Sequence, residues 1–333
     1  MTQRIAVVGA GAVGGHLAAR LARAGHQVSV VARGAHLEAI RANGLVFEAG
    51  SDRHVAKVAA SAHGAELGLQ DIVFVAGKAQ HLPGLAAEIP PLLGPETPVV
   101  FAINGVPWWY FHRFGNRPWT RMERLDPGGA IEANVPRERV IGAVIYSSNT
   151  VPAPGVVRSV TPNRNRFVLG EPDDTPSARV QKIAGLLAET GLEAPVADSI
   201  RREIWSKLLV NMGNSAACCL TGATVGQMLR NDEAVQVARR INEEAVQVAA
   251  RHGIELKPGY SPEQVQASLN SPVSGHKPSM LQDLEAGKPI ELDAQFVVPQ
   301  DFARQAGIAT PTLDTVIALL RLRAQIAVSS SQQ

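Results

Sequence analysis

The sequence predicts a two-domain α/β protein, in which a parallel sheet flanked by helices is followed by a helical domain. Its 333 residues exceed the ~250–300 residues beyond which a single core stops growing. Short β-branched runs alternate with helical segments in the N-terminal part, a pattern that is typical of βαβ units. From Ser199 onward, long helical segments replace that alternation, so we place the domain boundary near Asp198.

The N-terminal elements follow one another in a regular order. The apolar, β-branched run at residues 4–8 predicts a buried strand, and Gly25 and Gly44 mark the ends of the first two helices. The predicted strands lie at 4–8, 27–32, 71–76 and 97–103, and the predicted helices at 16–24, 36–42 and 82–93.

Residues 105–138 interrupt this order with several prolines and the pair Trp108-Trp109. They predict a long irregular insertion, and such loops in compact domains are usually functional or disordered. The two tryptophans either shape a substrate pocket or anchor the loop by hydrophobic contact. Further strands are predicted at 140–146, 156–160 and 167–170, antiparallel and at a sheet edge.

The C-terminal part is predicted to be all-helical. Its main helices are expected at 200–220, 232–252, 280–286 and 312–327. The predicted organisation is a dinucleotide-binding domain at 1–198, a helical substrate and catalytic domain at 199–328, and a polar tail at 329–333.

Composition excludes several classes of protein. Lys and Arg exceed Asp and Glu by 32 − 30 = 2, without a clustered basic excess, so we expect no nucleic-acid or membrane partner. No run of ~18 apolar residues predicts a membrane span. The two cysteines, Cys218 and Cys219, are adjacent, which provides neither an ordinary disulfide framework nor a metal-binding spacing. We therefore expect a cytoplasmic protein without a metal site.

A phosphate-binding turn follows the first strand. Its residues are Gly9, Ala10, Gly11, Ala12, Val13 and Gly14, a GxGxxG pattern between a strand and a helix. Gly9 permits the tight turn, Gly11 lets the backbone approach a pyrophosphate, and Gly14 allows close helix–strand packing. The apolar stretch at residues 5–15 therefore belongs to a Rossmann dinucleotide-binding motif rather than to a signal peptide.

The second strand ends at Arg33, where NAD-binding proteins place an acidic residue on the ribose 2′-hydroxyl. An arginine there can form charge-assisted hydrogen bonds to a 2′-phosphate, which favours NADPH as the cofactor. A solvated surface arginine is the alternative. Lys78 follows the next strand and contacts either cofactor or substrate, unless it is an ordinary loop lysine.

Lys207 carries the only charge in the apolar stretch 204–220. On a helix, Asn211, Asn214 and Cys218 fall on the same side as this lysine and form a polar stripe. Burial lowers the pKa of an amine toward neutrality, which suits a general acid that protonates a carbonyl oxygen during hydride transfer. The alternative is a lysine that extends to solvent at the helix edge.

Three further polar residues are candidates. Asn104, in an Asn-Gly pair after the 97–103 strand, either forms a turn or points toward a nicotinamide. Ser279 with Gln282 forms a capping-box pattern, which alone would explain the serine. Glu291 either caps a helix or binds a ribose or the Lys207 ammonium.

Over nearly its whole length the chain resembles the ketopantoate reductases (2-dehydropantoate 2-reductases). The matching segments are Gly9–Gly14, Arg33, Lys78-Ala79-Gln80, Asn104-Gly105, Trp205–Asn211, Ser279–Asp283 and Ile290–Asp293. The resemblance implies a Rossmann domain, an all-helical C-terminal domain like that of 6-phosphogluconate dehydrogenase, and an active site in the cleft between them. It also implies NADPH-dependent reduction of 2-dehydropantoate to pantoate, a step toward pantothenate and coenzyme A.

The resemblance also implies a role for individual residues. Lys207 would be the proton donor, and Asn104 would lie at substrate and nicotinamide. Asn211 and Ser279 would bind the substrate hydroxyl and carboxylate. Glu291 would hold the nicotinamide ribose side, and the backbone of Ala130 would lie by the cofactor.

The chain departs from the family in two places. Where the family has a second asparagine, four residues after the first, this chain has Ser215, and Asn214 comes one residue early. The insertion with Trp108 and Trp109 is also longer, which leaves open a bulkier 2-keto acid as substrate. A non-catalytic NADPH-binding sensor is a further alternative, and a homodimer is possible.

Overall fold

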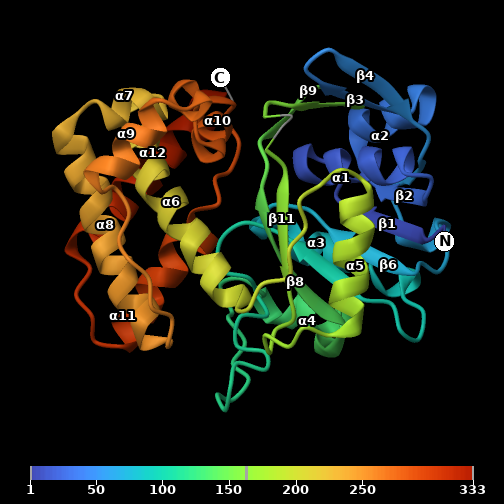
Figure 1. Ribbon diagram of the computed structural model, residues 1–333, viewed down its shortest axis with the longest axis horizontal. Coiled ribbons are helices and arrows are strands. Elements are labelled where there is room, and N and C mark those ends of the chain that lie inside the picture. The colour runs from blue at the N-terminus through green and yellow to red at the C-terminus, as the bar shows by residue number, and fades with distance from the viewer. Residues whose placement is uncertain (1, 162–163, 332–333) are drawn as a thin grey trace. The chain divides into compact units, whose positions relative to one another are not determined.

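The computed structural model describes residues 2–161 and 164–331, and the chain divides into two compact units, Met1–Glu203 and Ile204–Gln333. Figure 1 shows that the strands belong to the first unit and that the second unit is built from helices. Within the described residues, no helix is long and apolar enough to cross a membrane.

The first unit is built on a seven-stranded sheet with the order β11-β8-β7-β6-β1-β2-β5. Its strands are β1 (Arg4–Val8), β2 (Gln27–Val31), β5 (Ala59–Ser61), β6 (Ile72–Val75), β7 (Val99–Ala102), β8 (Val140–Tyr146) and β11 (Arg166–Gly170). All neighbours pair in parallel except β11, which is antiparallel to β8. The strand order reverses direction beside β1, which is the arrangement of a Rossmann fold and confirms the predicted class.

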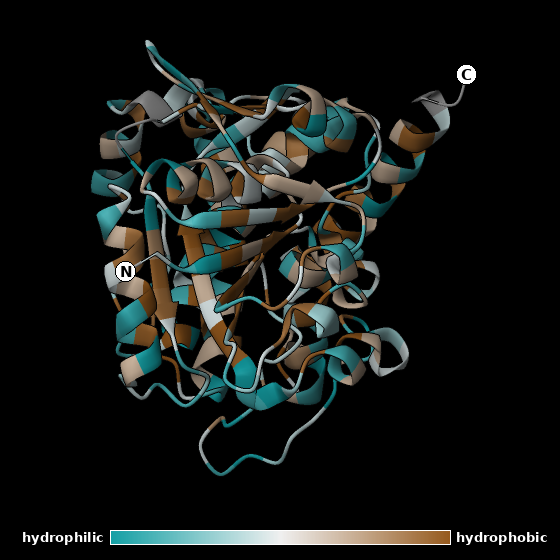
Figure 2. Ribbon diagram, turned by 90° about the vertical axis from the view of Figure 1, so that its right-hand side faces the viewer, coloured by the Kyte–Doolittle hydropathy of each residue, from teal (hydrophilic) through white to brown (hydrophobic). Residues whose placement is uncertain are grey.

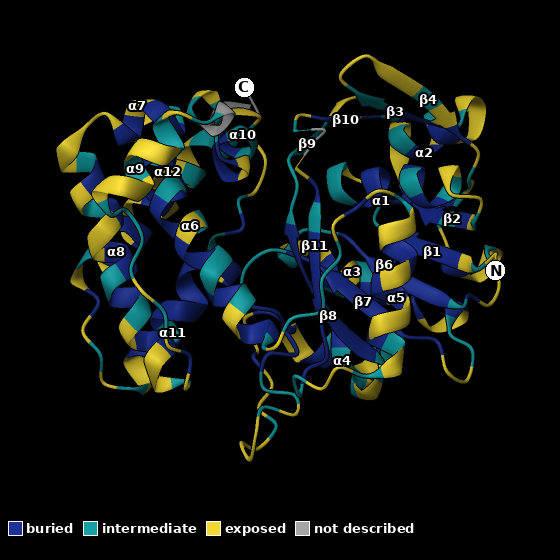
Figure 3. Ribbon diagram, in the orientation of Figure 1, coloured by how far each residue is buried: buried dark blue, intermediate teal, exposed yellow. Residues whose placement is uncertain are grey.

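The sheet is covered by helices, and the central strands are consequently apolar along their whole length. β6 and β7 are buried at every position, as Figure 3 shows by their dark blue colour, and Figure 2 shows apolar residues concentrated in the strands. The helices of this unit are α1 (Ala12–Arg23), α2 (Gly34–Asn43), α3 (Leu82–Ala86), α4 (Ala130–Asn134) and α5 (Ala178–Glu189). Leu17 of α1 and Leu187 of α5 belong to the same buried core as Val7 and Phe167 of the sheet.

A second sheet was not predicted. It has the order β4-β3-β10-β9, with β3 (Leu45–Ala49), β4 (Asp52–Ala56), β9 (Asn149–Ala153) and β10 (Val156–Ser159). The expectation of antiparallel strands at one sheet edge is confirmed for 167–170, because β11 is an edge strand and pairs antiparallel with β8. It is wrong for 156–160, which belongs to the second sheet, and 140–146 is not an edge strand. β8 lies inside the large sheet and parallel to β7, whereas β10 pairs in parallel with β3, whose residues are far away in the sequence.

Two predicted helices end four or more residues away from their predicted C-terminal ends, and α1 begins at Ala12, four residues before its predicted start. The predicted helix 82–93 stops at Ala86, and a separate 3₁₀ turn follows at Pro90–Leu92, because Pro90 and Pro91 have no N–H to donate to a continuing helix. The last helix continues to Ser331, beyond its predicted end at residue 327. The remainder of the predicted tail, 332–333, lies outside the described residues.

The second unit is helical, as predicted. It contains most of α6 (Ile200–Thr221), which begins in the first unit, followed by α7 (Val225–Leu229), α8 (Asp232–Arg251), α9 (Pro262–Leu269), α10 (Ser279–Glu285), α11 (Val298–Gln305) and α12 (Pro311–Ser331). α8 packs against α7, α11 and α12. Glu244 of α8 is buried and accepts hydrogen bonds from the N–H groups of Thr312 and Leu313, each at 2.9 Å. Its carboxylate therefore caps the first turn of α12.

The insertion after β7 is anchored inside the first unit. Trp108 and Trp109 are each 1% exposed. The Trp108 ring packs edge-on against Phe101, and the Trp109 ring fills the space that a side chain at Gly142 would occupy. This packing matches the interpretation of the tryptophan pair as an anchor for the loop.

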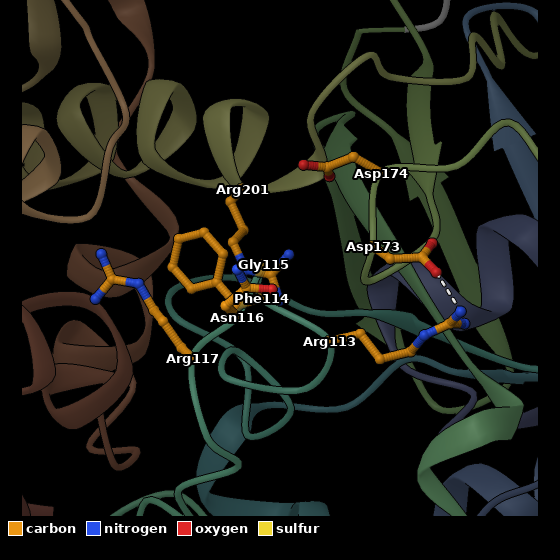
Figure 4. Close-up of a pocket in the computed structure, with 8 residues that line it drawn as sticks. All are labelled: Arg113, Phe114, Gly115, Asn116, Arg117, Asp173, Asp174 and Arg201. Carbon is orange, nitrogen blue, oxygen red and sulfur yellow. Dashed lines mark ion pairs between the residues drawn. The ribbon is translucent and has the colours of Figure 1, made fainter.

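A buried arginine of α6 also anchors the insertion after β7. Arg201 of α6 is 1% exposed and donates hydrogen bonds to the carbonyl oxygens of Tyr110, His112 and Pro172. Its guanidinium carbon lies 4.2 Å from the centroid of the Phe114 ring, and burial lowers the pKa of Arg201 to about 10 (Figure 4). The loop is thus ordered by one cation that several carbonyl oxygens share.

Arg201→Met is expected to lower the free energy of unfolding by at least about 3 kcal/mol, because it removes the side-chain donor to three carbonyl groups, two of them in buried hydrogen bonds. The control is Arg202→Met, since the neighbouring Arg202 is exposed and should change stability by no more than ~0.5 kcal/mol. Urea titration of the two variants measures the difference. Equal stability would show that the Arg201 hydrogen bonds do not hold the loop.

Candidate functional site

Two glycines of the β1–α1 turn occupy positions that no other residue can take. Gly9 has φ +96°, and its N–H donates to the carbonyl oxygen of Val31 at 3.0 Å. A Cβ at Gly9 would lie 2.8 Å from the Ala76 carbonyl oxygen, and one at Gly14 would lie 2.0 Å from the Gly9 carbonyl oxygen. The turn therefore requires glycine at both positions.

Gly11 is different, because a Cβ there would meet no atom within 4 Å. This residue caps α1 with no side-chain hydrogen bond, and the first turn, which includes Ala12 and Val13, contains no acidic residue. An anion requires space and N–H donors. Gly11 provides the space, and the start of α1 provides the N–H groups. The turn therefore fits the pyrophosphate of a dinucleotide.

His36 supports the same turn from α2. Its Nδ1 accepts a hydrogen bond from the Gly155 N–H at 3.0 Å, and its Nε2–H donates to the Ala10 carbonyl oxygen at 2.8 Å. The imidazole thus links Ala10 to the β9–β10 connection.

Arg33, Lys78 and Asn104 follow β2, β6 and β7, which are parallel strands of the large sheet, with β2 on one side of β1 and β6 and β7 on the other. Because parallel strands end at the same edge, the structure brings these residues to the edge that also carries Gly9–Gly14. The Arg33 side chain is 60% exposed, and its Nη2 donates to the Gly84 carbonyl oxygen at 3.1 Å. Lys78 and Asn104 are half-buried.

Ala130 begins α4, but this helix start differs from that of α1. The buried carboxylate of Asp126 accepts hydrogen bonds from the N–H groups of Ile131 at 2.6 Å and Glu132 at 3.1 Å. The start of α4 is therefore already capped by an acidic side chain, and α1 is the helix suited to a phosphate.

Lys207, the predicted proton donor, lies on α6. The residue is half-buried, and burial of its amino group lowers the pKa to about 8. The negative charge of Glu291, which is 7% exposed, acts in the opposite direction and raises the pKa of Lys207. The structure therefore brings together these two predicted residues, which are far apart in sequence.

Glu291 precedes an irregular helical turn. Residues Asp293–Val297 form a π-helical turn, and Pro299 follows at the second position of α11. Pro299 has no N–H with which to bond the Gln295 carbonyl, so a regular α-helix cannot pass through this point. Such turns are frequent at functional sites.

The remaining predicted residues of the second unit differ in their surroundings. Asn211 and Asn214 are half-buried on α6, and the Oδ1 of Asn214 accepts a hydrogen bond from the Tyr260 hydroxyl at 2.8 Å. Ser215 is 4% exposed. Sequence reasoning missed Tyr260, and the one signal that could have found it is Gly213, a glycine inside a helix, which indicates a close approach at this place.

The capping-box interpretation of Ser279 is wrong. The N-cap of α10 is Pro278, Ser279 is the first helical residue and is exposed, and Gln282 donates instead to the Lys277 carbonyl oxygen at 2.8 Å. Because Pro278 is extended and takes the N-cap position, the helix starts at Ser279, one residue earlier than a cap at Ser279 would place it, so capping does not account for the serine.

A pocket of about 540 Å³ lies in the first unit, outside the predicted site. Figure 4 shows its lining residues, which are Arg113, Phe114, Gly115, Asn116, Arg117, Asp173, Asp174 and Arg201. Arg113 forms an ion pair with Asp173, and Arg201 is bonded to backbone carbonyls. None of the predicted site residues lines this pocket. Among the described residues, no cluster of His, Cys, Asp or Glu could hold a metal ion.

Two family models match the chain. One, described as ketopantoate reductase PanE/ApbA, matches residues 5–174, and the other, its C-terminal domain, matches residues 199–324. A curated 2-dehydropantoate 2-reductase of Mesorhizobium japonicum is 44% identical over 321 residues, which cover 96% of this chain and 97% of the relative.

Solved structures of the same family have the same fold. A putative ketopantoate reductase from Ralstonia solanacearum is 38% identical, with a TM-score of 0.89 over 98% of this chain and 99% of its own. A PanE/ApbA family ketopantoate reductase from Ralstonia eutropha is 26% identical, with a TM-score of 0.82 over 97% of this chain and 99% of its own.

The Lys207 amine is expected to titrate near pH 8. The Glu291→Gln substitution is expected to lower the pKa of Lys207 further, because it removes the carboxylate that stabilises the charged ammonium. The pH dependence of reductive methylation at Lys207, followed by peptide mass spectrometry, measures both values. Glu285→Gln is the control, since Glu285 is exposed and pairs with Lys277. An unchanged titration in Glu291→Gln would refute the electrostatic coupling.

Proposed function

The chain belongs to the ketopantoate reductase family of oxidoreductases, and we propose that it catalyses the NADPH-dependent reduction of 2-dehydropantoate to pantoate, with Lys207 as proton donor. The observation that carries this proposal is the Lys207 amine, buried beside Glu291 with its pKa lowered to about 8. An amine with this pKa is still largely protonated at neutral pH and gives up its proton more readily than an ordinary lysine.

The residues of the first unit fit NADPH. The backbone of Gly9–Gly14 would hold the pyrophosphate at the start of α1, and Arg33 would bind the 2′-phosphate. Lys78, Asn104 and the Ala130 backbone would provide further contacts, and Glu291 of the second unit would bind the nicotinamide ribose side. When bound, NADPH supplies the hydride that adds to C2 of the keto acid.

Lys207 supplies the other half of the reduction. Its Nζ donates one proton to the carbonyl oxygen as C2 accepts the hydride, so that the C=O group becomes CH–OH and the amine is left neutral. Glu291 stabilises the charged ammonium and thereby favours the protonated form of Lys207 near neutral pH. The protein contributes the position of the donor and the electrostatics around it.

Polar side chains on two elements would bind the substrate. Asn211, Asn214 and Ser215 lie on α6 with Lys207, and Ser279 is exposed at the start of α10. Asn104 would join them from the end of β7. Together they offer hydrogen bonds to the carboxylate and the hydroxyl of a short hydroxylated 2-keto acid.

A bulkier 2-keto acid is the second candidate substrate. The tryptophan pair that suggested it is buried against Phe101 and Gly142, which favours the smaller substrate. Turnover of 2-dehydropantoate beside longer 2-keto acids, ranked by kcat/KM, separates the two. A non-catalytic sensor would bind NADPH and oxidise it with none of them.

Lys207→Ala is expected to lower kcat by ~100-fold or more while the Kd for NADPH stays unchanged, because only the proton donor is removed. Steady-state NADPH oxidation and a fluorescence titration measure the two quantities. Lys257→Ala, at an exposed lysine of the same unit, should retain full activity. Near-normal turnover by Lys207→Ala would end the proposed mechanism.

Arg33→Asp is expected to raise the Kd for NADPH at least tenfold and the Kd for NADH far less, because a carboxylate repels the 2′-phosphate (about 1.5–3 kcal/mol for the lost charged hydrogen bonds). Arg53→Asp, at an exposed arginine of β4, is the control. Equal weakening of both nucleotides would refute the assignment of Arg33.

A further inference from the structure

Tyr260 has a backbone conformation that tyrosine rarely adopts. Its φ is +68°, in the left-handed region, where a bulky side chain is unfavourable. Residues held in this way occur where the surrounding structure determines them, and they cluster at active sites and ligand clamps. The contacts that hold Tyr260 therefore indicate what it does.

A buried asparagine holds the Tyr260 segment against α6. Asn242 of α8 is 1% exposed. Its Oδ1 accepts a hydrogen bond from the Gly259 N–H at 3.1 Å, and its Nδ2 donates to the Leu209 carbonyl oxygen at 2.9 Å. A single side chain thus ties the backbone just before Tyr260 to the helix that carries Lys207.

The tyrosine ring lies directly on the α6 backbone at Gly213. A Cβ at Gly213 would be 2.2 Å from the Tyr260 hydroxyl oxygen and 2.5 Å from its Cε2. Glycine inside a helix is unfavourable by ~1 kcal/mol relative to alanine, and here its absent side chain makes room for the phenol. The phenol is therefore fitted to this turn of the helix.

The hydroxyl of Tyr260 determines how the Asn214 amide is used. It donates to the Oδ1 of Asn214 at 2.8 Å, so the carbonyl oxygen of this amide is turned toward the phenol and its NH₂ group, a donor, is turned away from the phenol. Burial raises the pKa of Tyr260 above its usual range, which keeps the phenol protonated as a donor throughout the neutral and mildly alkaline range. Asn214 is therefore presented to a hydrogen-bond acceptor.

We propose that Tyr260 is a positioning residue, which fixes Asn214 as a hydrogen-bond donor to the hydroxyl end of the 2-keto acid. Asn214 lies seven residues after Lys207, about 10 Å along the helix axis. The carbonyl and the adjacent carboxylate of the substrate belong near Lys207, so a donor two turns away reaches the remote hydroxyl. The inference rests on the proposed function, and it adds Tyr260 to the residues on which recognition of the substrate hydroxyl depends.

Tyr260→Phe tests the inference, since it removes only the hydroxyl. The KM for 2-dehydropantoate is expected to rise about threefold to tenfold, the effect of one neutral hydrogen bond, with kcat and the KM for NADPH within about twofold. For 3-methyl-2-oxobutanoate, which lacks the hydroxyl, KM should not change. Tyr146→Phe is the matched control, because the Tyr146 hydroxyl bonds to Glu203 at 3.3 Å in the first unit.

A double-mutant cycle separates positioning from stability. If Tyr260 acts through Asn214, Tyr260→Phe adds nothing to the KM of Asn214→Ala, whereas independent structural effects would add. An unchanged KM in Tyr260→Phe, additive effects, or an equal rise for the substrate without the hydroxyl would overturn the inference alone. Absence of turnover by the unmodified protein with either keto acid would overturn the proposed function itself, and the inference with it.

Discussion

The burial of one amine is the constraint on which the second unit depends. Lys207 lies on α6 between buried residues such as Trp205, Leu208 and Met212, and this environment disfavours its positive charge. Glu291 opposes that effect from the segment before α11, and the balance leaves the pKa at about 8. Burial thus makes the ammonium a stronger acid than an ordinary lysine, and Glu291 limits that effect.

The first unit depends on a different constraint, the absence of side chains in the β1–α1 turn. Gly9 and Gly14 are required by contacts with backbone and strand, whereas Gly11 faces open space. The comparison with α4 shows that a helix start alone does not make an anion site, because Asp126 already occupies that one. The start of α1, which follows the glycines, thus has no side-chain cap, whereas the start of α4 is capped by the Asp126 carboxylate.

The polar stripe on α6 shows how a departure from a family pattern is accommodated. Ser215 replaces the second asparagine of that pattern, and Asn214 lies ~100° around the helix from it. Tyr260 approaches Asn214 over Gly213, and Asn242 fixes the segment that carries the tyrosine. In the proposed role, the displaced amide remains a substrate ligand because three elements of the second unit hold it in one orientation.

By itself the sequence determined what depends on local chemistry. The apolar runs predicted every strand of the large sheet except β5, including Val140–Tyr146 to the residue, and the glycine pattern predicted the Rossmann turn. The tertiary structure alone decided the second sheet, since Val46 pairs with Val156 far along the chain. It also decided the start of α10 at Ser279, the contact of Tyr260 with Asn214, and the pKa of Lys207. The reason is physical: backbone preference is carried by neighbouring residues, whereas strand partners, burial and nearby charge come from residues that only folding brings together.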